Sequence, residues 1–167
     1  QDRSFLMELM EGVEDIPLGA LDQGIKWEWE SFQEYLDALE RKSFAMDVGA
    51  MIGHGPVRAY VLGKRANVTD RPPAQQKGGA DISPAEIEQM ATIVGQAIKA
   101  GALGFSTSRT LMHRDRSGTL VPGTLATTAE LLAIGRAIGQ NGNGKAVFEM
   151  ASDFMTGVDE SHTPENH

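Results

Sequence analysis

Three short motifs each predict the start of a helix, and their order limits the folds that the chain can adopt. All have a Ser or Thr followed three residues later by a Glu, and they lie at Ser31–Glu34, Ser83–Glu86 and Thr127–Glu130. In such a capping box the Ser or Thr hydroxyl accepts a hydrogen bond from the backbone N–H of the Glu, and the Glu side chain accepts one from the backbone N–H of the Ser or Thr. Apolar residues recur at helical spacing after each motif. We therefore expect helices over 32–41, 84–100 and 128–141.

A short apolar run follows each expected helix and predicts a strand. These runs cover residues 44–52, 102–107 and 145–150. Strands that alternate with helices of this length are joined by right-handed β–α–β crossovers and form a parallel sheet. The expected fold class is therefore α/β with parallel strands, either as a small open sheet or as an arc of a barrel.

The other segments give weaker signals. Residues 4–10 show helical spacing, 11–24 read as loop, and 56–62 as a short helix. Residues 62–82 contain Pro and Gly pairs and are expected to form a loop excursion. The 167 residues are fewer than the ~200 to 250 of a closed (β/α)8 barrel. The sequence begins with Gln1 and ends on a polar run, so we expect a piece of a longer chain.

Composition excludes several partners and sites. Fifteen Lys and Arg against 23 Asp and Glu give a net charge of −8, which disfavours binding to nucleic acid or to an anionic membrane. No apolar stretch is long enough to span a bilayer. The chain has no cysteine, so disulfides and thiolate zinc sites are excluded. A chain without cysteine fits a reducing compartment, and we expect a cytoplasmic protein.

In parallel α/β folds, reactive groups gather at the carboxyl ends of the strands. His54 lies between two glycines after the first strand. Two interpretations carry equal weight: a ligand, proton carrier or substrate contact, and an imidazole that caps a loop. Arg58 is a candidate clamp for a carboxylate, although pairing with an acidic neighbour is the commoner role of such an arginine. Ser106 and Arg109 are candidate substrate contacts, with turn formation as the alternative for the serine.

Glu149 and Asp153 are the carboxylates expected at the end of the third strand. Either is a weak candidate for a metal ligand or a base. A different enzyme could use them as an acid/base pair. In an extended strand they would lie on one face but roughly 13 Å apart, too far to share a proton, whereas they approach each other if the strand ends at Met150. His113 and its charged neighbours read as a solvated loop.

Several residue strings add a family resemblance. Together they resemble the N-acyl-D-amino-acid deacylase (D-aminoacylase) branch of the amidohydrolase superfamily and cover most of residues 4–154. The strings are Phe5–Pro17, Trp27–Phe32, Tyr35–Leu39, Asp47–Gly49 with Gly53–Gly55 and Arg58, and Ala100–Thr107.

The resemblance implies a metal-dependent (β/α)8 TIM-type barrel that hydrolyses a C–N amide bond of a small molecule, with zinc lowering the pKa of a bound water. Residues 1–155 would be a partial barrel holding roughly the third to fifth strands, and 156–167 a truncated connecting segment. His54 and Arg58 match a Gly-His-x-x-(Leu/Val)-Arg string and would line the active-site mouth. The family's main metal ligands and its catalytic Asp would lie outside this chain, so we expect no tightly bound zinc in the chain alone.

Two departures leave alternatives open. The family's Thr-His-x-Arg string at the fifth strand is replaced by Glu149–Asp153, and its Gly-Leu-x-Tyr segment by Ser108–Met112. A subgroup with one metal, or with another amide or cyclic amide as substrate, is therefore open. The alternative function is a non-catalytic α/β binding or scaffold module derived from the barrel. Because a partial barrel exposes its sheet edges, we also expect self-association.

Overall fold

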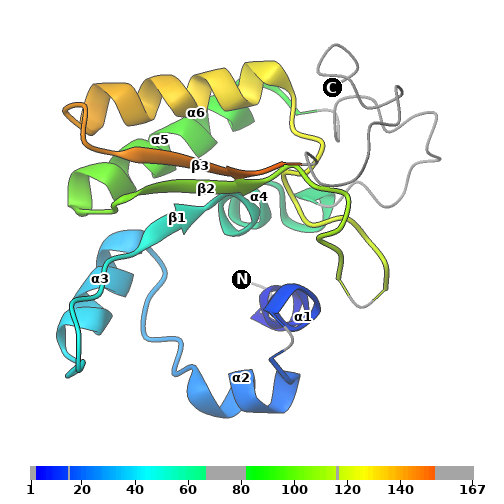
Figure 1. The fold of residues 1–167 in the computed structure, drawn as a ribbon. Coiled ribbons are helices and arrows are strands. Elements are labelled where there is room, and N and C mark those ends of the chain that lie inside the picture. Colours follow the sequence, from blue (N-terminus) through cyan, green and yellow to red (C-terminus); the bar gives the residue numbers. More distant parts are fainter. Residues whose placement is uncertain (1–2, 15, 67–81, 116, 153–167) are drawn as a thin grey trace.

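A three-stranded parallel sheet forms the centre of the molecule, in the order β1-β2-β3 (Figure 1). The computed structural model describes residues 3–14, 16–66, 82–115 and 117–152. The strands are β1 (Met51–Gly53), β2 (Gly104–Ser108) and β3 (Val147–Ala151). The predicted α/β class with parallel strands is confirmed.

The crossovers between the strands are helical. Helix α4 (His54–Leu62), the 3-10 helix η1 (Gly63–Ala66) and α5 (Pro84–Ala100) lie between β1 and β2, and α6 (Thr128–Asn141) connects β2 to β3. Helices α5 and α6 pack side by side over one face of the sheet (Figure 1).

The register assigns each strand residue to one face of the sheet. Ile52 pairs with Phe105, and Phe105 with Phe148, whereas Ser106 pairs with Gly53 and Glu149. Because successive residues of a strand point to opposite faces, these two rows lie on opposite sides of the sheet. Ile52 and Phe105 belong to the core under the helices, so the row of Ser106 lies on the other face. The core residues of the two helices are Met90, Val94, Ala97, Ile98, Ile134 and Ile138.

The capping signals explain where these helices begin. Ser31 and Ser83 each form the complete capping box, so α3 (Phe32–Glu40) and α5 start where the sequence predicts. Gly101 ends α5 in the left-handed conformation, with φ 118°. Thr127 caps α6 by accepting a hydrogen bond from the N–H of Glu130, but the Glu130 side chain does not return to the cap.

Two predicted elements were wrong. Residues 11–24 were expected to be loop, but α1 (Arg3–Glu14) extends into them and α2 (Leu18–Gly24) follows. The first strand was expected over 44–52, but only its last residues join the sheet. Phe44, Met46 and Val48 are exposed, because β2 offers hydrogen bonds only to the end of this run.

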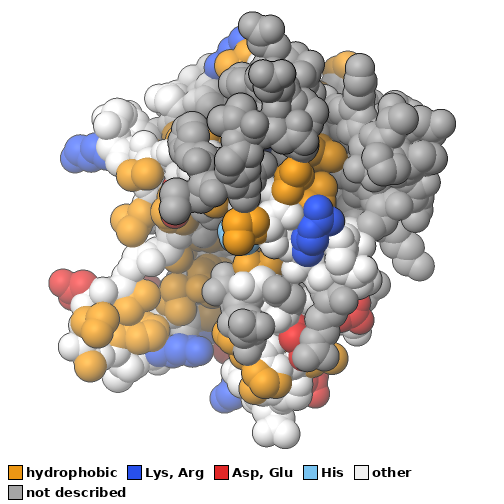
Figure 2. All heavy atoms as spheres, turned by 45° about the vertical axis from the view of Figure 1, so that its right-hand side comes forward, with side chains coloured by type: hydrophobic (Ala, Val, Ile, Leu, Met, Phe, Trp, Pro, Cys, Tyr) orange, Lys and Arg blue, Asp and Glu red, His pale blue; other side chains and the backbone are white. Residues whose placement is uncertain are grey.

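The chain also presents an apolar groove and two free sheet edges. A groove of about 870 Å³ lies between α3 and the α/β unit, lined among others by Trp29, Phe32, Ile52, Val57 and Tyr60. Hydrophobic side chains gather around a hollow in the surface (Figure 2). Within the described ranges, neither β1 nor β3 pairs with a further strand at its outer edge. All five residues of β3 are exposed.

Some expectations lie outside the described ranges. The loop excursion over 62–82 falls mostly there, as do Asp153 and the segment 156–167. The end of α4 and the turn η1 occupy the first residues of that excursion. Among the described residues no helix combines the length and apolar character needed to span a membrane.

Candidate functional site

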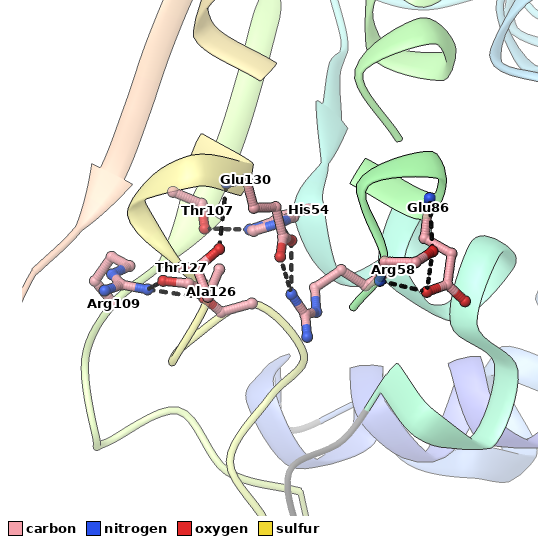
Figure 3. A network of polar contacts seen from close by, with 10 residues as sticks. His54, Arg58, Glu86, Thr107, Arg109, Ala126, Thr127 and Glu130 are labelled. Carbon is pink, nitrogen blue, oxygen red and sulfur yellow. Dashed lines mark hydrogen bonds and ion pairs between the residues drawn. The ribbon is translucent and has the colours of Figure 1, made fainter. Parts of the chain in front are cut away.

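A buried polar cluster lies where the carboxyl ends of β1 and β2 meet the first turns of α4 and α6 (Figure 3). His54 directly follows β1 and opens α4, and Arg58 follows one turn later. Thr107 comes from β2, and Glu130 from the first turn of α6. Sequence positions up to 76 residues apart are therefore joined at this end of the sheet.

His54 is held through both nitrogens of its ring. Nδ1 lies 2.7 Å from Oγ1 of Thr107, and Nε2 lies 2.7 Å from Oε1 of Glu130. The ring also packs on Phe105, with centroids 5.2 Å apart, and is only 1% exposed. Gly123 covers the same ring, since a Cβ at this position would lie 2.5 Å from Nδ1. These contacts together fix the position and the orientation of the imidazole ring.

Arg58 and Glu130 form a buried ion pair. Nη1 of Arg58 donates to both carboxylate oxygens of Glu130, at 2.6 Å each, and both side chains are 0% exposed. Burial raises the pKa of the Glu130 carboxyl, but the hydrogen bond from His54 and the charge of Arg58 together lower it below its usual range. Glu130 is therefore a carboxylate at neutral pH.

The charge state of His54 follows from its burial. Burial lowers the pKa of His54 more than the neighbouring Glu130 raises it, so the imidazole is neutral at neutral pH. Its Nε2–H then donates to the Glu130 carboxylate, and the Thr107 hydroxyl donates to the lone pair of Nδ1. The result is a directed chain of hydrogen bonds from Thr107 through His54 to Glu130, whose carboxylate also accepts hydrogen bonds from Arg58.

Arg109 lies beside this cluster but has backbone partners. Its Nη1 donates to the carbonyl oxygens of Gly123 at 3.3 Å and of Ala126 at 2.9 Å, while burial lowers the pKa of its guanidinium. It therefore holds the loop that packs on His54. Ser106 is half-buried on the opposite face of the sheet and does not join the cluster. Ser108 hydrogen-bonds His113 at 2.8 Å, so His113 is tied to the end of β2.

Of the two predicted carboxylates the structure describes Glu149, which lies apart from the cluster. Glu149 is exposed on β3 and pairs in register with Ser106, on the face away from His54. Asp153 lies outside the described ranges, so the acid/base pair stays a prediction.

Sequence reasoning missed Glu130 and Thr107 as members of the site. Glu130 was interpreted as the last residue of a capping box, and Thr107 as the end of the second expected strand. Glu130 could have been found from His54 and Arg58, two basic candidates for which the sequence analysis named no acidic partner. A buried arginine requires a carboxylate, so a Glu at another strand end was the residue to look for.

The described residues do not fit a zinc site. They contain no group of three or more His, Cys, Asp or Glu side chains that could hold a metal ion. Both ring nitrogens of His54 are engaged, and Arg58 occupies both oxygens of Glu130. A divalent cation in this cluster would therefore meet a guanidinium at close range.

Comparison with known proteins finds similarity to a D-aminoacylase and to uncharacterised mycobacterial proteins. The chain is 30% identical to the D-aminoacylase of Alcaligenes xylosoxydans xylosoxydans over 126 residues, which are 75% of this chain and 22% of that enzyme. It is 31% identical over 134 residues to uncharacterised proteins of Mycobacterium bovis and Mycobacterium tuberculosis. No protein-family model matches the chain, and no solved structure matches it significantly. The chain is thus similar to D-aminoacylase and spans about a fifth of the length of these relatives.

Proposed function

We propose that this chain contributes the third to fifth strands of a (β/α)8 barrel in a longer hydrolase that cleaves a C–N amide bond, most simply that of an N-acyl amino acid. The similarity to D-aminoacylase over three quarters of the chain carries the proposal. The parallel sheet supports it, because both outer edges are free within the described part and a barrel would pair them.

In this arrangement the two faces of the sheet have different roles. The face away from α5 and α6 would line the interior of the barrel, where Ser106 and Glu149 pair in register. We assign these two side chains to the substrate-facing surface. His54, Arg58 and Arg109 have partners within the protein, so we assign them to positioning the strand ends and loops that form the mouth of the site.

Any zinc of the enzyme would be bound mainly by residues outside this chain. The described residues do not assemble a metal site. We therefore expect zinc titration of the 167-residue chain to give no stoichiometric site of submicromolar affinity. A site of that affinity would contradict this assignment.

The decisive experiment compares this chain with the longest product of the gene that encodes it. Both would be incubated with zinc and N-acetyl-D-leucine, with N-acetyl-L-leucine and a cyclic amide as further substrates, and the released amine would be measured. We expect hydrolysis by the longer product alone. If neither product cleaves any of these amides, while the 167-residue chain is monomeric and unfolds cooperatively, the binding or scaffold module replaces the enzyme.

A further inference from the structure

Two donor nitrogens of the Arg58 guanidinium have no partner among the described residues, although the side chain is completely buried. Nη1 binds Glu130, whereas Nε and Nη2 make no hydrogen bond within the part of the chain that the structure describes. Buried donors are nearly always paired in native proteins, because an unpaired donor loses its water without compensation. The free nitrogens turn away from Glu130 and His54 (Figure 3). A group that accepts hydrogen bonds is therefore expected on that side of the guanidinium.

The geometry of these two nitrogens selects the acceptor. In the planar guanidinium, Nε–H and one N–H of Nη2 run parallel along one edge, which matches the two oxygens of a carboxylate. Glu130 contacts only Nη1 and leaves this edge unused. One planar acceptor with two oxygens would satisfy both nitrogens.

The charges around Arg58 also favour an anion. Arg58 and Arg109 are positive, Glu130 is negative and His54 is neutral. The charges of both arginines lower the pKa of His54, and both arginines interact electrostatically with Glu130 and with each other. Counted over the described residues, the cluster therefore carries one uncompensated positive charge. The first turns of α4 and α6 lie here as well, and helix N-termini favour negative charge. A single carboxylate balances this charge, whereas a phosphate dianion would exceed it.

We propose that the Nε–Nη2 edge of Arg58 binds a second carboxylate, in addition to that of Glu130. The carboxylate has two possible sources, an acidic side chain of the protein itself or a free carboxylate ligand. The proposal does not depend on amide hydrolysis, so it can fail or succeed independently of the proposed function.

Acetate is the probe for a free ligand, and acetamide is its uncharged control. The thermal midpoint of the 167-residue chain would be measured against each at constant ionic strength, in the wild type, in Arg58→Lys and in the matched surface control Arg136→Lys. Lysine keeps the positive charge but lacks the two-nitrogen edge. We expect acetate to raise the midpoint saturably in the wild type and in Arg136→Lys, and not in Arg58→Lys. Acetamide should have no effect.

A second measurement identifies a carboxylate supplied by the protein. The Nε–H of Arg58 would be followed by 15N–1H NMR in the wild type before and after acetate is added, which also decides the matter if Arg58→Lys fails to fold. A downfield, slowly exchanging Nε–H that acetate does not change assigns the carboxylate to the protein itself. An Nε–H that resonates at the chemical shift of the exposed Arg136, together with no thermal response to acetate, overturns the proposal.

Discussion

The Glu130 carboxylate is the single side chain on which the buried cluster depends most. It compensates Arg58 and accepts the hydrogen bond of His54, with no exposure to solvent. Glu130→Gln leaves the guanidinium without its counter-charge, and breaking a buried ion pair in this way costs about 3 to 5 kcal/mol. Urea unfolding should show this loss. Glu88→Gln, on the exposed face of α5, is the control and should leave the free energy of unfolding almost unchanged.

Two residues of the cluster make the stability depend on pH. The unfolded chain binds protons at His54 near pH 6.5 and at Glu130 near pH 4.5, and the pKa of each group is lower in the folded protein. The unfolded state therefore binds more protons as the pH falls, so acid destabilises the fold. The contribution of the two groups to the free energy of unfolding is fully present above pH 6.5. It is lost as the pH falls, first through His54 and then, below pH 4.5, through Glu130.

Urea unfolding between about pH 8 and pH 4 checks this order. In His54→Gln the first part of the decline should disappear, while the part below pH 4.5 remains. Stability that stays constant or rises as the pH falls from 7 to about 5 would contradict the neutral, buried imidazole.

At this scale the sequence predicted which residues matter better than what they contact. His54 was identified from its place after a strand and between two glycines, and Arg58 from its place one helical turn later. The direction of the Glu130 side chain could not be predicted, because a Glu three residues after a cap can either return to the cap or enter the core. Glu34 and Glu86 return, and Ser83 and Arg65 lower the pKa of Glu86 to about 2. Glu130 turns inward because Arg58, 72 residues away, needs its charge.

At the level of elements, the loop before α6 is fixed against the start of α4. Gly123 has φ +103° and lies directly over the His54 ring. Gly123→Ala should therefore destabilise the protein by about 1 to 3 kcal/mol, since the new methyl group forces the ring or the loop to move. Gly135→Ala, inside α6, meets no atom within 4 Å and should instead stabilise by about 0.5 to 1 kcal/mol. Equal effects of the two substitutions in thermal and urea unfolding would show that the loop moves away from the new methyl group without a loss of stability, which would contradict this prediction.

Helices were predicted more accurately than strands for a physical reason. Caps and apolar stripes are local, so α3, α5 and α6 begin at the residues their sequences indicate. A strand is defined by its partner, and the run before β1 finds hydrogen bonds with β2 only at its end. Helix α2 has no side-chain cap and therefore left no local signal.

For the whole molecule, the edge of β3 decides how the chain behaves on its own. Its five residues are exposed, and Met150 is 48% exposed. An uncovered apolar edge strand is a template for pairing with a second chain, so the isolated chain should self-associate. Met150→Lys places a charge on that edge and should lower the apparent mass measured by light scattering. Leu132→Lys, an equally exposed position on α6, is the matched control and should not. If both variants or neither lower the mass, association does not use the β3 edge, and the free edges would cease to support an arc of a larger barrel.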